Sequence, residues 1–233
     1  MNKISALILF VLFTSKLYAD DGGVFIRVKG TTAAGGGGAA DFTDTFTETV
    51  TVVLSLHTEG GTTWADRDSS ATGISDDGAT DVAYCGIASD EFGYYNSYTP
   101  SDADYCVEGD VKVSGSGKTS MGIALRMATA TQDQYFVRYS GGDGQWELYK
   151  RVSGTVTGLG TDYTGDVPTT VKSVRLCASS SSLTVYVAGV SRITATDSAI
   201  TATGKAGIYN YFGDTGATEY IDNIEVYNTV AAP

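Results

Sequence analysis

LTVYVAGVSR, residues 183–192, begins the stretch that decides the fold, and TGKAGIYNYF (203–212) and EYIDNIEVY (219–227) complete it. Each segment is short, rich in β-branched and aromatic residues, and bounded by turn residues, as β-strands are. Leu183 and Val187 share one face of an extended chain, and Ala188-Gly189 then offers a two-residue turn. The closing part of the chain is therefore predicted to be antiparallel β-structure.

Strand signals continue upstream of this stretch. Met121, Ile123 and Leu125 fall on one face of an extended segment, because strand side chains alternate between two faces. The segments QYFVRYS (134–140) and WELYKRV (146–152) are separated by a glycine-rich turn, which is typical of a hairpin. From residue 41 onward we find no apolar stripe with the 3.6-residue period of a helix. The sequence predicts an all-β domain.

The beginning of the chain has the pattern of a secretory signal. Lys3 precedes an apolar run from Ile4 to Phe13, and Ala19 is followed by two aspartates. The apolar run is about half as long as the roughly 20 residues that span a bilayer. We therefore expect export and no membrane span. The expected organisation is a signal peptide at 1–19, an N-terminal strand and glycine-rich linker at 20–40, the domain at 41–228 and a tail at 229–233.

The segment VFIRV (24–28) is strand-like and is followed by four consecutive glycines at 35–38. Such a linker is flexible. Two interpretations stay open: the segment is an edge strand of the same domain, or it adds to the open sheet edge of a second copy. The second interpretation predicts a homo-oligomer.

The net charge of the chain limits the classes of molecule that it is expected to bind. The 233 residues include 15 Lys and Arg and 27 Asp and Glu, for a net charge of −12. Loss of residues 1–19 would remove Lys3 and Lys16 but no acid, which leaves −14. Nucleic acid is not an expected partner, because phosphate contact requires a basic surface. Strong negative charge suits a secreted, extracellular protein.

Three cysteines, Cys85, Cys106 and Cys177, leave an odd one in an oxidising compartment. Cys85 and Cys106 flank one loop, and their pairing would contribute about 3 kcal/mol in the chain-entropy model. A Cys106–Cys177 disulfide is an alternative, because both side chains are predicted to point outward from their strands. Three free thiols are a further alternative. We take Cys85–Cys106 as the expected disulfide.

The residues that carry a resemblance lie between Thr45 and Tyr227: SLHTEGGTTW (55–64), ADYCVEGDVKV (103–113), GIALRM (122–127), QYFVRYSGGDGQWELYKRVSG (134–154), LTVYVAGVSR and IDNIEVY. They resemble a divergent, laminin G-like branch of the concanavalin A-like lectin/glucanase superfamily, as found in phage tail-associated and environmental extracellular domains. The resemblance implies a jelly-roll sandwich of two antiparallel sheets. It also implies a concave outer face and loop rims where relatives bind glycans.

The sequence lacks the carboxylate strand of the superfamily's glucanases. In the nearest match, Glu219, Asp222 and Glu225 are spaced by steps of three, which puts Asp222 on the face opposite the other two. The one histidine, His57, is assigned a turn or capping role. We therefore expect no enzyme and no cofactor. Calcium is considered because acidic loops such as 66–68 and 75–78 supply hard oxygen ligands.

Strand alternation predicts a binding face. If Met121 and Ile123 point inward, small residues form an outward floor beside Arg126. The remaining outward side chains and the rim of an aromatic loop complete the candidate site: Phe136, Arg138, Glu147, Tyr149, Arg151, Tyr94, Tyr95 and Tyr98. Aromatic rings, arginines and a carboxylate suit a sugar. Alternatively, the charged residues form a surface ion-pair ladder and the tyrosines pack onto the sheet.

The sequence supports three hypotheses about function. The leading hypothesis is a secreted, non-catalytic lectin-like module that binds extracellular or cell-surface glycans. The alternative is a structural subunit of a filament, appendage or virion, assembled by strand pairing through residues 24–28. The third is a glycoside hydrolase or lyase of the same fold.

Overall fold

The computed structural model describes residues 16–20, 23–27, 39–46, 52–57, 61–66, 74–77, 82–85, 91–113, 120–211 and 219–230. The chain divides into two compact units, residues 1–33 and residues 34–233. In the first unit, β1 (Lys16–Asp20) and β2 (Gly23–Arg27) form an antiparallel hairpin. The strand expected at 24–28 is thus present one residue earlier. Its part in self-association stays a prediction, and most of the expected signal peptide lies outside the described residues.

The second unit contains two antiparallel sheets within the described residues. Sheet I has seven strands, in the order β13 (Thr155–Tyr163), β12 (Gln145–Val152), β11 (Gln134–Ser140), β10 (Ser120–Met127), β17 (Lys205–Tyr211), β8 (Glu91–Asn96) and β5 (Trp64–Asp66). Sheet II has nine strands, in the order β16 (Val190–Thr196), β15 (Ser182–Val187), β14 (Lys172–Ser179), β9 (Tyr105–Lys112), β18 (Tyr220–Tyr227), β7 (Val82–Cys85), β6 (Ile74–Asp77) and β4 (Val52–Val53), with β3 (Phe42–Asp44) paired to β18. A 3-10 turn, η1 (Leu54–Leu56), is the one helical element in these ranges.

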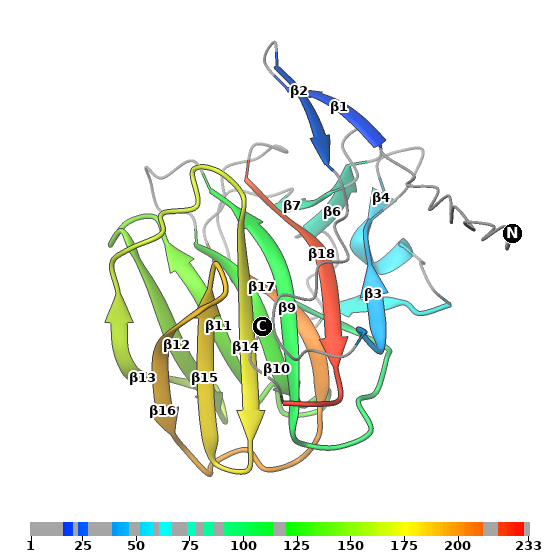
Figure 1. Cartoon of the computed structure of the whole chain (residues 1–233). Helices are drawn as coiled ribbons and strands as arrows, with labels where there is room; N and C mark the ends of the chain where they lie inside the picture. The colour runs from blue at the N-terminus through cyan, green and yellow to red at the C-terminus, as the bar shows by residue number, and fades with distance from the viewer. Residues whose placement is uncertain are drawn as a thin grey trace, which may run out of the picture. The chain divides into compact units, whose positions relative to one another are not determined.

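The closing stretch decides the fold because it contributes strands to both sheets. β15 and β16 form the expected hairpin in sheet II. β17 then crosses to sheet I, where it lies between β10 and β8, and β18 returns to sheet II between β9 and β7. Figure 1 shows the result, two stacked sheets with β14, β9 and β18 in front of β10, β11 and β17. The predicted all-β, two-sheet jelly roll is confirmed.

The core lies between the two sheets. Met121, Ile123 and Leu125 of β10 point into it, as alternation predicts, and they pack in one cluster with Val107 and Val111 of β9. All five side chains are fully buried. Burial of an aliphatic side chain contributes about 1.5–3 kcal/mol, so these layers hold the sandwich together. The opposite faces of both sheets are left for other roles.

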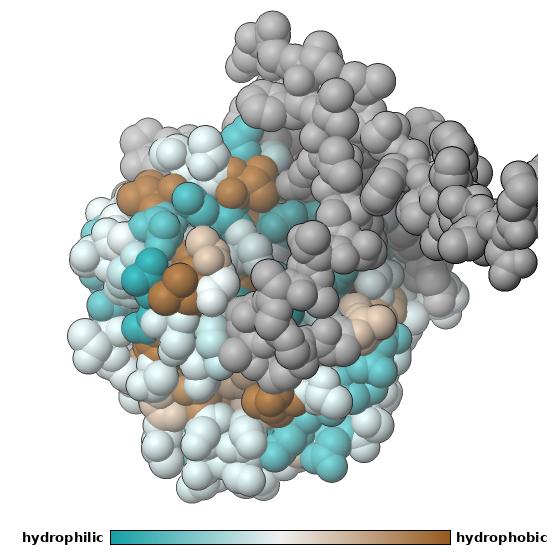
Figure 2. Space-filling model, viewed as in Figure 1, coloured by the Kyte–Doolittle hydropathy of each residue, from teal (hydrophilic) through white to brown (hydrophobic). Residues whose placement is uncertain are grey.

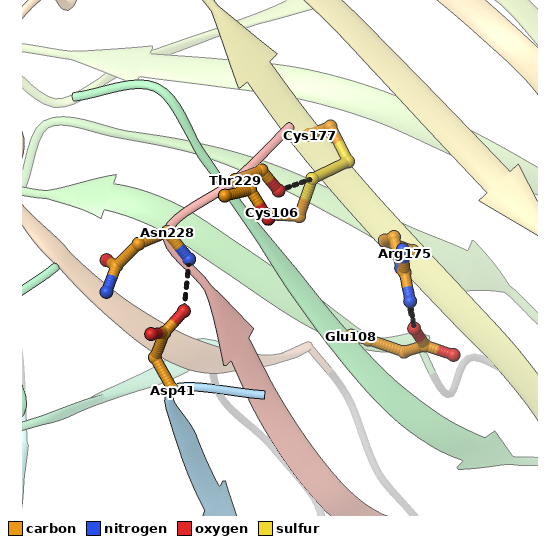
Figure 3. The surroundings of a disulfide bond; sticks show 7 residues. All are labelled: Asp41, Cys106, Glu108, Arg175, Cys177, Asn228 and Thr229. Atoms are coloured by element: carbon orange, nitrogen blue, oxygen red, sulfur yellow. Dashed lines mark hydrogen bonds and ion pairs between the residues drawn. A yellow bond between two sulfur atoms is a disulfide. The ribbon is translucent and has the colours of Figure 1, made fainter. Parts of the chain in front are cut away.

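The disulfide joins Cys106 to Cys177, so the expected Cys85–Cys106 pairing is wrong. The reason is the register of neighbouring strands: Cys106 of β9 lies directly opposite Cys177 of β14, with 4.1 Å between their Cα atoms. Cys85 lies on β7, and β18 separates that strand from β9. Figure 3 shows the bond bridging the two strands, with Thr229 beside Cys106. The side chain of Cys85 lies outside the described residues.

The outer face of sheet II carries mixed chemistry. Figure 2 shows this side of the molecule, where hydrophilic side chains predominate and apolar residues lie in small separate groups. Among the described residues, Val190 (48% exposed) and Val167 (39%) are examples of large apolar side chains that reach the surface. Scattered apolar residues of this kind are ordinary on a protein surface. A stack of aromatic rings lies on the outer face of sheet I.

Candidate functional site

The outer face of sheet I carries a row of side chains that crosses five strands. In register, Tyr95 of β8 lies beside Gly207, Gly207 beside Ala124, Ala124 beside Phe136, and Phe136 beside Tyr149 of β12. Neighbouring strands lie about 4.8 Å apart, so the row spans most of the sheet. Glycine and alanine in its middle leave room above the backbone for the larger rings on either side.

A second row lies next to the first on the same face. Tyr209 of β17 lies beside Gly122 of β10, which lies beside Arg138 of β11, and Arg138 lies beside Glu147 of β12. An added Cβ at Gly122 would lie 1.8 Å from the carbonyl oxygen of Val137. Only glycine fits there, and the sheet floor stays low between Tyr209 and Arg138.

Three rings from the two rows stack on one another. The centroids of Phe136 and Tyr209 lie 4.1 Å apart, and those of Phe136 and Tyr149 lie 5.4 Å apart, with interplanar angles of 20° and 21°. Phe136 is fully buried, whereas Tyr149 and the neighbouring Tyr95 are half-buried. We call these four rings, together with Arg138 and Glu147, the aromatic face.

Arg138 is held at the centre of the aromatic face. Its Nε donates to Glu147 Oε2 at 2.9 Å, and its guanidinium carbon lies 5.0 Å from the Tyr149 ring centroid and 6.0 Å from that of Tyr209. Burial alone would lower the pKa of Arg138, but the neighbouring Tyr209 and Glu147 raise it above its usual value. Burial and the nearby Glu147 raise the pKa of Tyr149. Both groups therefore keep their protons at neutral pH.

Two carboxylates meet at one end of the aromatic face. Gln145 Nε2 donates to Glu147 Oε1 at 3.0 Å and to Asp162 Oδ2 at 3.1 Å. Partial burial, followed by the charges of Glu147 and Asp143, raises the pKa of Asp162. Glycosidases place two carboxyls roughly 5 to 9 Å apart, and one bridging amide nitrogen keeps this pair near the short end of that range. A carboxyl pair is the arrangement that retaining glycosidases use as acid and nucleophile, although Glu147 is also held here by Arg138.

Arg126 does not lie on this face, which corrects our expectation. The pairing of β10 with β17 shifts between Ala124 and Met127, and Arg126 between them has a left-handed backbone with φ of 50°. Such a bulge reverses the alternation. Arg126 therefore points into the sandwich end, and Met127 joins the aromatic cluster in its place.

Inside, Arg126 is a buried cross-link among three loops. Its Nε donates to Ala103 O at 2.9 Å, and its two terminal nitrogens donate to Ser180 O at 3.1 Å. Further bonds reach Ile200 O at 2.8 Å and Asp104 Oδ1 at 3.3 Å. The side chain is 1% exposed. It therefore has a structural role at the end of the sandwich.

The other expected residues are divided between the face and its surroundings. Arg151 lies on the same side of β12 as Tyr149, and its Nη2 donates to Gln132 Oε1 at 3.2 Å. Tyr98 lies elsewhere: its ring stacks on Phe42 at 5.3 Å. Its hydroxyl accepts from Asn228 Nδ2 at 3.0 Å. Tyr98 is therefore a structural residue rather than part of the rim.

Sequence reasoning missed Tyr209, Gln145 and Asp162. The sequence did indicate the position of Tyr209, because Lys205, Gly207 and Tyr209 are alternate residues of the closing stretch and therefore point to the same face of a strand. That stretch serves as a fold marker and also carries one ring of the aromatic face. Tyr94, in contrast, was expected on the rim, and its side chain lies outside the described residues.

His57 has the turn role that we expected and a buried partner as well. Its backbone N–H donates to Leu54 O at 3.1 Å and closes η1. Its Nε2 lies 2.9 Å from Asp44 Oδ1, while Trp64 Nε1 donates to Asp44 Oδ2 at 2.7 Å. Burial alone would raise the pKa of Asp44, but the hydrogen bonds from His57 and Trp64 lower it. This group stabilises the fold away from the aromatic face.

No metal site is present within the described ranges, where no three His, Cys, Asp or Glu side chains gather as ligands. Residues 67, 68 and 78 of the acidic loops considered for calcium lie outside those ranges. Calcium binding by these loops therefore stays a prediction. In the described part of the chain, no helix has the length and apolar character needed to cross a membrane.

Solved structures share the fold of this chain. The carbohydrate-binding module CBM66 from Bacillus subtilis aligns with a TM-score of 0.52 and 17% identity over 60% of this chain and 84% of that one. The Bacillus licheniformis β-glucanase aligns at 0.50 and 12%, over 76% and 96%. The Crh5 transglycosylase in complex with NAG aligns at 0.53 and 12%, over 80% and 86%. No family model and no curated protein matches the sequence.

These likenesses define the class of fold, a concanavalin A-like jelly-roll sandwich, and agree with the resemblance seen in the sequence. They contradict our expectation that the chain is no enzyme, because a glucanase and a transglycosylase share the fold. At these identities the likenesses show the fold alone. Function has to be argued from the aromatic face.

Proposed function

We propose that the aromatic face of sheet I binds carbohydrate. The observation that carries the proposal is the stack of Tyr209, Phe136 and Tyr149, with the Arg138–Glu147 ion pair on a floor of glycine and alanine. The apolar C–H face of a pyranose rests on an aromatic ring, and its hydroxyls pair with a planar guanidinium and carboxylate oxygens. Half-buried Tyr149 supplies the accessible ring.

Two further observations support an extracellular glycan as the ligand. The Cys106–Cys177 disulfide fits an oxidising compartment, as does the signal-like segment at residues 1–19. A protein with the same fold is named as a carbohydrate-binding module. We therefore propose that the protein is exported and meets its glycan outside the cell.

A glycan array probed with the mature chain, residues 20–233, tests the proposal. We expect binding with and without calcium, and loss of at least about tenfold in affinity for Tyr149→Ala. Tyr186→Ala is the matched control, because Tyr186 is a half-buried tyrosine on the outer face of sheet II. An array with no bound glycan in either condition would overturn the proposal.

Hydrolysis of the bound glycan is a second candidate function, favoured by the bridged pair Glu147 and Asp162. In a retaining reaction, protonated Asp162 gives its proton to the leaving sugar oxygen while Glu147 attacks the anomeric carbon. Water then releases the sugar from Glu147 and returns a proton to Asp162. We expect release of reducing ends by the wild type and loss of that release in Asp162→Asn. Binding without release of reducing ends would reject hydrolysis and leave the first proposal standing.

A further inference from the structure

A cleft of about 610 Å³ opens at one end of sheet I, beyond the aromatic face. It lies where β10 ends and where β11 and β17 begin, between the loops 128–133 and 199–204. Of the binding residues expected from the sequence, Arg126 alone lies in its lining. The cleft lies along the strand direction from the first row, past the last residue of β10.

The walls of the cleft are held by backbone contacts. In the first loop, Ala128 N donates to Asp133 O at 2.8 Å, and Gln132 N donates to Ala128 O at 3.1 Å. The second loop ends at Gly204, whose φ is 61°, and an added Cβ there would lie 2.3 Å from the Arg126 backbone. The first loop is therefore closed by its own backbone bonds, and the second packs on the bulge of β10.

The charged groups in the cleft lining are hydrogen-bonded within the protein and balance one another in sign. Lys205 Nζ donates to Ser97 O at 2.7 Å and also to Thr99 Oγ1, and burial lowers the pKa of Lys205. Asp133 Oδ1 accepts from Ser153 N at 2.7 Å. Arg126 is engaged by loop carbonyls. Lys205 and Asp133 carry opposite charges, and Arg126 is ion-paired with Asp104 at 3.3 Å, so the lining has no net charge that would select a charged ligand.

The rest of the lining is neutral and matches a polyol. Thr129, Thr131 and Thr201 contribute hydroxyls, and alanine side chains alternate with them. A sugar has the same mixture, since its C–H groups meet methyl groups and its hydroxyls meet donors and acceptors. The chemistry of the cleft therefore favours a neutral sugar over a uronate or a sulfated unit.

The cleft is continuous with the aromatic face through Met127. This side chain lines the cleft and also packs in the cluster with Phe136 and Tyr209. Gln134 of β11, two residues before Phe136 and paired in register with Arg151, is fully buried, and both its amide atoms lack a hydrogen-bond partner among the described residues. Leaving such a group unpaired costs about 1–3 kcal/mol of stability.

We propose that this cleft binds the neutral terminal sugar of a glycan whose next units lie on the aromatic face. The proposal rests on the proposed function and adds the class of the terminal unit and its place. Selection of a neutral sugar follows from the absence of net charge in the lining. A glycan that contacts both the cleft and the aromatic face is expected because Met127 belongs to both.

The test compares variants on an array that carries neutral and uronic acid oligosaccharides of equal length. Thr201→Trp fills the cleft from an exposed position, and Val190→Trp, exposed at the edge of sheet II, is its matched control. We expect neutral glycans to bind the wild type and the control equally and Thr201→Trp to bind at least about tenfold more weakly. Amide NMR shifts on adding the bound oligosaccharide should include residues 128–133 and 199–204.

Each of the following outcomes would overturn one part of the proposal. Full binding by Thr201→Trp together with loss in Tyr149→Ala would reject the cleft and keep the aromatic face. Preference for uronic acid oligosaccharides would reject neutral selection. If nothing on the array binds the wild type, the cleft proposal and the proposed function fall together.

Discussion

The outer faces of the two sheets use the same local chemistry for different purposes. On sheet II, Arg175 Nε donates to Glu108 Oε2 at 2.6 Å, and its guanidinium carbon lies 4.4 Å from the Tyr227 ring centroid. On sheet I, Arg138 makes the same pair of contacts with Glu147 and Tyr149. In both cases the glutamate is directly opposite the arginine on a neighbouring antiparallel strand.

The surroundings of the two arginines differ. Next to Arg175, the Cys106–Cys177 disulfide joins β9 to β14, as Figure 3 shows. Ser173 Oγ also donates to Glu108 there. Around Arg138 the neighbours are stacked rings above glycine and alanine. An Arg–Glu–Tyr group alone therefore does not identify a site. On sheet II its neighbours include a disulfide cross-link, whereas on sheet I it lies beside a low floor and the half-buried ring of Tyr149, and that difference is the basis of the proposed binding face.

Removing the disulfide should have the largest effect and should act on stability alone. The bonded cysteines are separated by 71 residues. A loop of that length constrains the unfolded chain by about 4 kcal/mol in the chain-entropy model. We expect Cys106→Ser/Cys177→Ser to lose that much in urea unfolding, with unchanged glycan affinity at temperatures where it stays folded. Weaker binding by the folded variant would show that sheet II also contributes to the site.

Gly122→Ala should have the next largest effect, because its Cβ would meet the backbone of β11. Overpacking costs about 1–3 kcal/mol, and a backbone neighbour has little room to shift. Gly158→Ala is the control on the same sheet, since its Cβ would lie 3.6 Å from the Tyr149 ring, an ordinary contact. Thermal unfolding should show a loss of about 3 kcal/mol for Gly122→Ala and little change for Gly158→Ala. Equal stability of the two variants would contradict the low floor between Tyr209 and Arg138.

The two arginines offer the most direct test of the comparison. Arg175→Met and Arg138→Met each leave a glutamate without its guanidinium, so both should lose about 1–3 kcal/mol of stability. Only Arg138→Met should weaken glycan binding, by about tenfold in isothermal titration. If Arg175→Met weakens binding as much, the distinction between the two faces fails.

Changing the pH should have the smallest effect on binding. The pKa values of Tyr149 and Arg138 are raised above their usual ranges, so neither group loses its proton between about pH 6 and 9. Glycan affinity should therefore be constant over this range in titration calorimetry. A sharp fall near the upper end of the range would mean that the pKa of Tyr149 is lowered below the usual value of about 10.

Stability, in contrast, should fall in acid. The pKa of Asp44 is lowered in the folded protein, so its contribution is complete above the unfolded value of about 3.9 and is lost as the pH falls through the folded pKa. We expect the melting temperature to drop below about pH 5. Asp44→Asn should reduce that drop, and an unchanged acid profile in the variant would contradict the assignment.

Strand alternation in the sequence was sufficient to place Phe136, Arg138, Glu147 and Tyr149 on one outward face, because a side-chain period of two depends only on extended backbone. The fold class could be predicted for the same reason, because the closing segments also alternate in this way and are bounded by turn residues. Whether this face binds a glycan is a separate matter, which the array decides.

Only the tertiary structure decided the remaining features, because each depends on which strands become neighbours. The bulge at Arg126 arises from the pairing of β10 with β17, and that pairing also brings Tyr209 onto Phe136. Cys106 meets Cys177 because β9 lies beside β14, 71 residues further along the chain. Alternation within a strand is local and can be read from the sequence, whereas register between distant strands is set by packing of the whole core.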